Sequence, residues 1–181
     1  MRQRVRFFLS SLVSGLLCLL VVVPVAMGRA ETFRADMTFA EEVAPAGVVL
    51  VDQGSSGKAF FHYNQAIQEI RFDLFLSQGQ GLTQAHIHLG ADGQRGAVVV
   101  FLAASGYIGG SNPGGLDVDK GRWARAIITQ GSVIPQTFTA PDGTIFVVQD
   151  IPSLLAACRA GFCYAEYHTV VNPSGEGRGQ L

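Results

Sequence analysis

The sequence lacks the short motifs that mark the common enzyme families. Its 181 residues contain no Gly-x-Ser-x-Gly nucleophile elbow, no phosphate-cradling loop and no dinucleotide fingerprint. Charged residues are few, at 15% of the total, and the lysines and arginines are scattered along the chain. Because nucleic-acid binding needs a basic stripe, we expect no nucleic-acid partner. No internal repeat is visible, which argues against a repeat architecture.

A basic and then apolar segment opens the chain. Three arginines precede a continuous apolar run at residues 7–25, and the small residue Ala30 follows. This order is typical of a secretory signal peptide cleaved after Ala30. It predicts residues 1–30 as the signal and residues 31–181 as one secreted or periplasmic domain, with no membrane contact after cleavage. The apolar run is long for a signal, so an uncleaved membrane anchor is the alternative.

Cleavage would change both the charge and the cysteine content. It removes four arginines and no acidic residue, so 13 basic and 14 acidic residues become 9 and 14, a net charge near −5. It also removes Cys18 and leaves Cys158 and Cys163 in a chain bound for an oxidising compartment. We therefore expect a disulfide between these two, which contributes about 2 kcal/mol by closing a short loop. A pair of buried free thiols is the alternative.

From Thr32 onward the apolar residues recur with a period of two rather than 3.6, which predicts strands with one buried face. The predicted strands are residues 33–39, 48–51, 58–63, 70–76, 85–90, 97–102, 145–148, 162–169 and 175–181. A turn is expected at residues 79–81, a loop at 106–115, and a short helix at 151–160 that ends at Gly161. Many short strands with one helix predict an all-β fold, an antiparallel β-sandwich.

Two histidine segments stand far apart in the sequence, at residues 85–90 and 164–181. On an extended strand His86 and His88 point to the same face, about 6.6 Å apart. If the two segments become neighbours in the fold, His168 joins them. Three imidazoles in one place suit a copper or zinc ion.

Two acidic residues lie near His168 in the sequence. Glu166 or Glu176 would be a fourth metal ligand, or a hydrogen-bond acceptor that fixes a ring tautomer. The alternative is that the histidines are hydrogen-bonding residues of the fold, which bond across strands or to carbonyls of the turn at residues 172–175. His62 has no such neighbours and is expected to stand alone.

These residues resemble the chordin-type domain family, written CHRD. The matching features are Glu42-Val43 with Pro45, Ala85 to Gly90, Gly96 to Leu102, Tyr164, His168-Thr169, Asn172-Pro173, Gly175-Glu176 and Arg178 to Leu181. The resemblance spans nearly the whole chain after residue 30. Two positions depart from the family pattern: Glu166 is often asparagine there, and Gly177 replaces a more usual isoleucine.

The resemblance implies an immunoglobulin-like sandwich with a Greek key like that of copper-zinc superoxide dismutases, which also carry a His-x-His strand. A similarity of fold does not establish chemistry. We therefore expect an exported, non-enzymatic binding module for a protein or surface ligand, with a metal site at His86, His88 and His168. One alternative is a superoxide-dismutase-like copper enzyme, for which the histidines are too few. Another is a structural or adhesive domain whose histidines are scaffold.

Overall fold

The fold is taken from a computed structural model that describes residues 30–104 and 115–181. The predicted signal peptide lies outside the described residues, except for Ala30, which begins the first strand. The predicted loop at 106–115 also lies outside them, except for its last residue. Among the described residues, no helix is long and apolar enough to cross a membrane.

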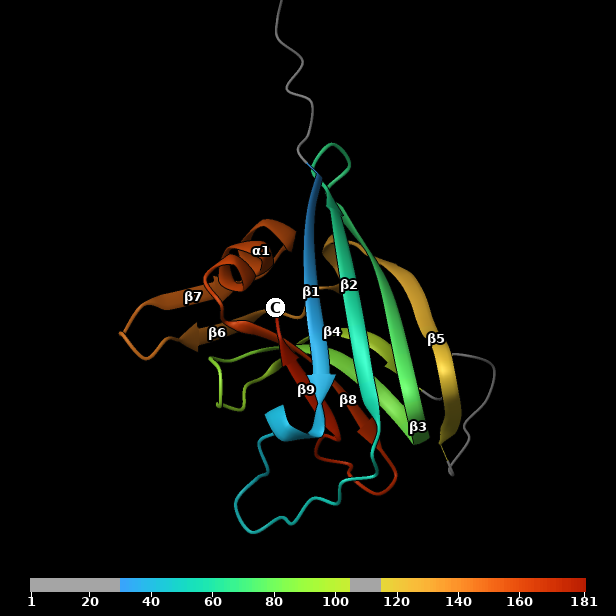
Figure 1. The fold of residues 1–181 in the computed structure, drawn as a ribbon. Helices are drawn as coiled ribbons and strands as arrows, with labels where there is room; N and C mark the ends of the chain where they lie inside the picture. The colour runs from blue at the N-terminus through green and yellow to red at the C-terminus, as the bar shows by residue number, and fades with distance from the viewer. Residues whose placement is uncertain (1–29, 105–114) are drawn as a thin grey trace, which may run out of the picture.

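Nine strands and one α-helix make up the described chain (Figure 1). The strands are β1 (Ala30–Thr38), β2 (Ser56–Asn64), β3 (Glu69–Leu89), β4 (Val98–Ala104), β5 (Leu116–Ile128), β6 (Gln136–Thr139), β7 (Ile145–Val148), β8 (Cys163–Thr169) and β9 (Gly177–Gln180). The helix is α1 (Ile151–Arg159), and two 3-10 turns are η1 (Phe39–Glu41) and η2 (Gln130–Ser132). The prediction of a mostly β, antiparallel fold with one short helix is confirmed.

The main sheet closes on itself instead of forming the two facing sheets of the expected immunoglobulin-like sandwich. β1 pairs with β2, β2 with β3, β3 with β8, β8 with β9, and β9 with β1, so five antiparallel strands form a barrel. β4 and β5 extend the sheet from β3, and β6 and β7 form a separate hairpin. Closure removes the free strand edges that an open sheet would leave.

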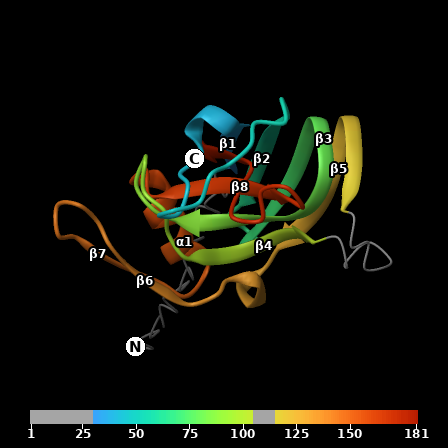
Figure 2. The same cartoon turned by 90° about the horizontal axis from the view of Figure 1, so that it is seen from below.

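Strand β3 closes the barrel because it pairs with both β2 and β8. Its length was not predicted. The sequence indicated a turn at residues 79–81 between two strands, but the chain continues as one strand of 21 residues. Gln78 and Gly81 adopt positive φ angles of 56° and 58°, and the pairing with β5 shifts register between Gly79 and Leu82. The local signal for a turn therefore produces an irregularity that redirects the strand without ending it. Its first part pairs with β2, and its second part pairs with β8 and β4 (Figure 2).

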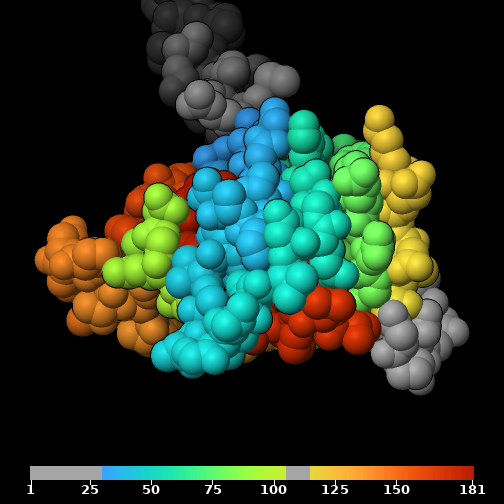
Figure 3. Space-filling view, turned by 60° about the horizontal axis from the view of Figure 1, so that its bottom comes forward, coloured from blue at the N-terminus to red at the C-terminus, as the bar shows by residue number. Residues whose placement is uncertain are grey.

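The predicted strand at residues 48–51 is wrong. These residues have no regular structure, and Val49 is 89% exposed. They belong to an extended segment, residues 42–55, that runs over the outside of the barrel. We call it the covering segment. It is tied down by Asn172, whose side chain accepts a hydrogen bond from the backbone N–H of Val51 and donates one to the Val51 carbonyl. Figure 3 shows this segment in cyan at the surface, beside red C-terminal residues.

The barrel interior is filled by alternate residues of each strand, as the period of two predicts. The interior residues include Ala35, Met37, Ala59, Phe61, Phe72, Leu74, Leu76, Ile87, Ala165 and Tyr167, each no more than 3% exposed. The residues between them face outward. This places Arg34 and Asp36 outside on β1, and His86 and His88 outside on β3.

The helix begins and ends where the sequence places it. The Asp150 carboxylate accepts the backbone N–H of Ser153, which caps the first turn, and Gly161 follows the last turn with a φ of 79°. The predicted disulfide between Cys158 and Cys163 is present and joins α1 to β8. A disulfide indicates an oxidising compartment outside the cytoplasm.

Reduction of the disulfide is expected to lower the free energy of unfolding by about 2 kcal/mol, because the bridge closes a loop of only a few residues. The measurement is urea unfolding with and without a reductant. The double variant Cys158→Ala, Cys163→Ala is the control, and its unfolding should not respond to the reductant. A wild-type curve that is unchanged by reductant would contradict a stabilising bridge.

Gly179→Ala is expected to destabilise the fold by about 1–3 kcal/mol. A Cβ at this position would lie 2.3 Å from the backbone carbonyl oxygen of Asp36, where β9 passes β1, and backbone gives way less easily than a side chain. Gly131→Ala is the matched control, since its nearest neighbour, the Thr129 hydroxyl, is 3.9 Å away. Thermal unfolding of the two variants should differ by several degrees, and equal melting temperatures would contradict the prediction.

Candidate metal centre

The two predicted histidine segments lie side by side. β3 and β8 pair in antiparallel register, so that His86 lies opposite Glu166 and His88 lies opposite Tyr164. Neighbours in such a register share a face, and here it is the outer face of the barrel. His168 lies on the same face of β8, two residues beyond Glu166. We call His86, His88, His168 and Glu166 the histidine cluster.

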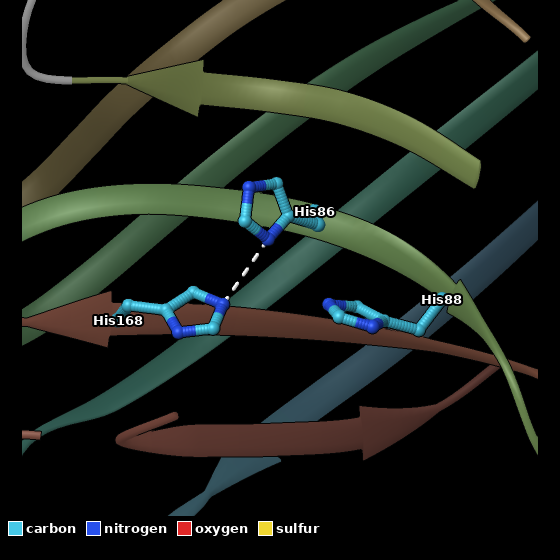
Figure 4. A group of neighbouring side chains, drawn as sticks. All are labelled: His86, His88 and His168. Atoms are coloured by element: carbon cyan, nitrogen blue, oxygen red, sulfur yellow. Dashed lines mark hydrogen bonds between the residues drawn. The ribbon is translucent and has the colours of Figure 1, made fainter. Parts of the chain in front are cut away.

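The cluster is buried although it lies outside the barrel. The three histidines are 3–5% exposed and Glu166 is 1% exposed. The rings turn toward one another (Figure 4), and one ring nitrogen of each histidine lies within 4.8 Å of the others. The closest pair is His86 Nδ1 and His168 Nε2, at 3.1 Å. The predicted approach of the three imidazoles is therefore present in the structure.

Backbone carbonyls fix the tautomers of two rings. His88 Nδ1 lies 3.0 Å from the Gly96 carbonyl oxygen, and His168 Nδ1 lies 3.1 Å from that of Pro173. Because a carbonyl oxygen only accepts, both Nδ1 atoms carry the hydrogen. His168 Nε2 therefore accepts a hydrogen bond from His86 Nδ1 at 3.1 Å, and in the neutral form of His88 its Nε2 presents a lone pair to the centre of the cluster. This is how metal-binding histidines are usually oriented.

Several polar atoms at the centre have no hydrogen-bond partner. Among the described residues, the buried side-chain nitrogen and oxygen atoms without a partner are Glu42 Oε2, His86 Nε2, His88 Nε2 and Glu166 Oε2, all in or beside the cluster. His88 Nε2 and Glu166 Oε2 lie only 2.9 Å apart, but His88 carries its hydrogen on the other nitrogen. Two lone pairs therefore face each other at a distance that only a proton or a cation between them would stabilise.

A second carboxylate meets Glu166 from the covering segment. The Glu42 side chain is 1% exposed and lies against Glu166. Burial raises the pKa of Glu42, and the contact with Glu166 raises it further. Burial also disfavours the charged form of Glu166, but the adjacent His88 and Glu42 side chains outweigh this and lower its pKa. The pair thus carries one proton, held by Glu42, and one negative charge on Glu166.

Burial holds the imidazoles of His86 and His168 in the neutral form. Burial lowers the pKa of His86 to about 3, and the nearby His168 and His88 add to the effect. Burial likewise lowers the pKa of His168, although Glu166 acts in the opposite direction. Neutral rings and one ionised carboxylate are the donor set of a divalent metal site, since metal ligands must be deprotonated.

Residues outside the predicted set hold the cluster in place. The Tyr164 ring stacks on His88, with ring centroids 4.8 Å apart and 10° between the planes. Arg178 covers the other side of Tyr164, 3.6 Å from the ring centroid, and its guanidinium donates to the carbonyls of Ala91 and Gln94. Arg178 thereby fixes the hairpin that carries the Gly96 carbonyl. The alternation of residues on β8 predicted that Tyr164 shares a face with Glu166 and His168. No sequence signal indicated the role of Arg178.

Glu176, the other predicted acidic residue, lies in a different network. Its carboxylate is fully buried and accepts hydrogen bonds from Gln53, Ser55, Thr169 and Asn172. All four donors are neutral. Two of them belong to the covering segment, so Glu176 fastens that segment over the β8–β9 connection. Of the two predicted acidic residues, only Glu166 therefore lies in the histidine cluster.

His62 stands apart from the cluster, as expected. It lies on β2, opposite Thr32 on β1 and Arg71 on β3, and its Nδ1 is 3.2 Å from the Thr32 hydroxyl. Glu42 is the residue at the site that sequence reasoning missed. Glu42 and Val43 belong to the family resemblance, but nothing in the local sequence places Glu42 beside Glu166. The path of the covering segment brings the two carboxylates together.

The neutral histidines make stability depend on pH. An unfolded histidine takes up a proton near pH 6.5, whereas folded His86 does so near pH 3. Between these values the unfolded state binds more protons, so the free energy of unfolding falls as the pH falls from 6.5 toward 3. In metal-free protein, we expect His86→Gln to reduce this slope in urea unfolding and His62→Gln to leave it unchanged. A slope that is the same in all three proteins would contradict the assignment.

Residues 33–181 match the CHRD domain. No curated protein and no solved structure matches the chain significantly. The family match covers both histidine segments, the covering segment and every strand from β2 onward, well over half of the sequence. The chain therefore belongs to the CHRD domain family.

Proposed function

We propose that this CHRD domain is an exported, non-enzymatic module that binds a zinc or copper ion. His86, His88 and His168 would supply three nitrogen ligands, and Glu166 would supply the fourth ligand. The observation that carries the proposal is the convergence of three buried imidazoles, one ring nitrogen of each within 4.8 Å of the others, beside the unpaired His88 Nε2 and Glu166 Oε2. A cation among them would satisfy the lone pairs of His88 Nε2 and Glu166 Oε2 and would replace the hydrogen bond between His86 Nδ1 and His168 Nε2.

The alternative of scaffold histidines accounts for only part of the geometry. Hydrogen bonds to the Gly96 and Pro173 carbonyls and the bond between His86 and His168 account for both nitrogens of His168 and one nitrogen each of His86 and His88. They leave the close approach of His88 Nε2 to Glu166 Oε2 unexplained. With His88 neutral, this contact sets an ionised carboxylate against a lone pair in a buried site, which costs several kcal/mol unless a cation lies between them.

The donor set favours zinc or copper over harder cations. Imidazole suits zinc and copper, whereas calcium and magnesium prefer oxygen ligands. Three imidazoles and one carboxylate fill the four positions of a tetrahedral zinc ion. In such a site the ion has no open position for a substrate, which supports a binding or structural role.

A superoxide-dismutase-like enzyme would need further histidines to bridge and hold a second metal. His62 is the fourth histidine of the chain, and its contact with Thr32 on another part of the barrel keeps it away from the cluster. The disulfide supports export to the periplasm or the cell exterior. The module would there meet a protein or surface ligand.

Zinc added to metal-free wild-type protein is expected to bind with a stoichiometry of one and to raise the melting temperature. At a free concentration one hundred times the Kd, the gain is about 2.7 kcal/mol. The variant with His88→Gln and His168→Gln should lose both effects, and Glu166→Gln should weaken binding at least about tenfold. His62→Gln is the matched control and should bind like wild type.

Elemental analysis and a superoxide assay complete this test. Protein purified from its native compartment without a nickel column should contain about one equivalent of zinc or copper, and it should not turn over superoxide. Metal-free protein that fails to bind zinc or copper would refute the proposal. Stoichiometric binding with superoxide turnover would refute its non-enzymatic part.

A further inference from the structure

The cations that are scattered in the sequence gather on one face of the barrel. β1, β2, β3 and β5 lie side by side (Figure 1), and residues directly opposite one another in their registers share a face. Arg34 lies opposite Phe60, Lys58 opposite Phe75, and Phe75 opposite Arg122. We call this outward side the basic face. Its cations are Arg34, Lys58, Arg71, Lys120, Arg122 and Arg125.

The separation of charge is pronounced. From residue 30 onward the chain has nine lysines and arginines and fourteen acidic residues, all within the described residues. Six of the nine cations lie on the basic face, but only three of the fourteen acids do, Asp36, Glu69 and Asp73. This face thus has a net charge of three positive units in a domain that is negative overall. A field of this kind attracts anionic partners and speeds their association.

Asp73 organises the centre of this face. It is 5% exposed and lies 2.5 Å from Arg125 Nε, 3.7 Å from Arg122 and 4.0 Å from Arg71. One carboxylate therefore holds three guanidinium groups, whose side chains remain about half exposed. The guanidinium groups are positioned but not neutralised, and each keeps donors that face solvent. Arginines held in this way lose less entropy when they bind a carboxylate bidentately.

Two phenylalanines lie among the cations. Phe60 and Phe75 are half-buried, with ring centroids 6.0 Å apart, and Arg34 lies 5.8 Å from the Phe60 ring centroid. The face thus offers flat apolar rings beside fixed guanidinium groups. A partner that fits both features has apolar ring faces and carboxylates at close, regular intervals.

We propose that the basic face binds a linear polysaccharide of acidic sugars, a polyuronate. The C–H face of each sugar ring would pack on Phe60 and Phe75, and the carboxylates would pair with Arg71, Arg122 and Arg125. The site is separate from the histidine cluster and does not depend on a bound metal.

A polyuronate fits this face better than single-stranded nucleic acid. Sequence-independent binding of a single strand uses aromatic side chains on which successive bases stack. Here the two rings stand at 81° to each other, so successive bases, which lie parallel in a stack, could not both lie flat on them, whereas neighbouring sugar rings need not be parallel. The forked arginine donors match planar carboxylates.

Binding of purified protein to polygalacturonate, measured by calorimetry at low salt, tests this proposal. We expect saturable binding that weakens steeply as salt is added, and no binding to neutral dextran. The variant with Arg71→Gln and Arg122→Gln should bind at least about tenfold more weakly. Arg125 is kept because of its short contact with Asp73, so that the fold is preserved.

The matched control removes the same charge elsewhere, with Arg95→Gln and Arg159→Gln, and should bind polygalacturonate like wild type. Circular dichroism melting establishes that both variants are folded. The proposal is overturned if neither variant weakens binding, if both weaken it equally, or if dextran binds as well. Tighter binding of single-stranded DNA of similar length would assign the face to nucleic acid instead.

Discussion

The continuity of β3 is the constraint on which the rest of the structure depends. Its first part pairs with β2 and β5 and its second part with β8 and β4, so one strand joins the two ends of the chain. The redirection near Gly81 brings the part of β3 that carries His86 and His88 alongside β8. The barrel closes and the histidine cluster forms through the same set of hydrogen bonds. The fold and the site are therefore inseparable here.

Periodicity in the sequence predicted most of the strands but not their connections. The alternation of Ile70, Phe72 and Leu74 gave the strand and its buried face, because burial on one side imposes a period of two. Whether a glycine turn ends a strand or only bends it depends on hydrogen bonds to strands elsewhere in the chain. The predictions of a turn at residues 79–81 and of a strand at 48–51 were wrong for this reason. Contacts with residues distant in the sequence decide the structure of both segments.

The sequence predicted the three histidines of the site but not every residue that meets them. Two histidines on one strand face and a third in the C-terminal segment gave the three imidazoles. Glu42 could not be found, because it reaches Glu166 through a loop without a local pattern. The departure at Gly177 has a structural reason: a Cβ there would lie 2.4 Å from the Tyr167 ring. The bulk that isoleucine would supply is thus provided by Tyr167, from the neighbouring strand.

The fastening of the covering segment has a consequence for exchange with the solvent. Gln53 and Ser55 are both held by the single carboxylate of Glu176, and Val51 is held by Asn172, which also donates to that carboxylate. Because these bonds share one acceptor group, losing one leaves the others poorly satisfied. The segment should open in one cooperative event, and whatever lies beneath it would enter and leave slowly however tightly it is held.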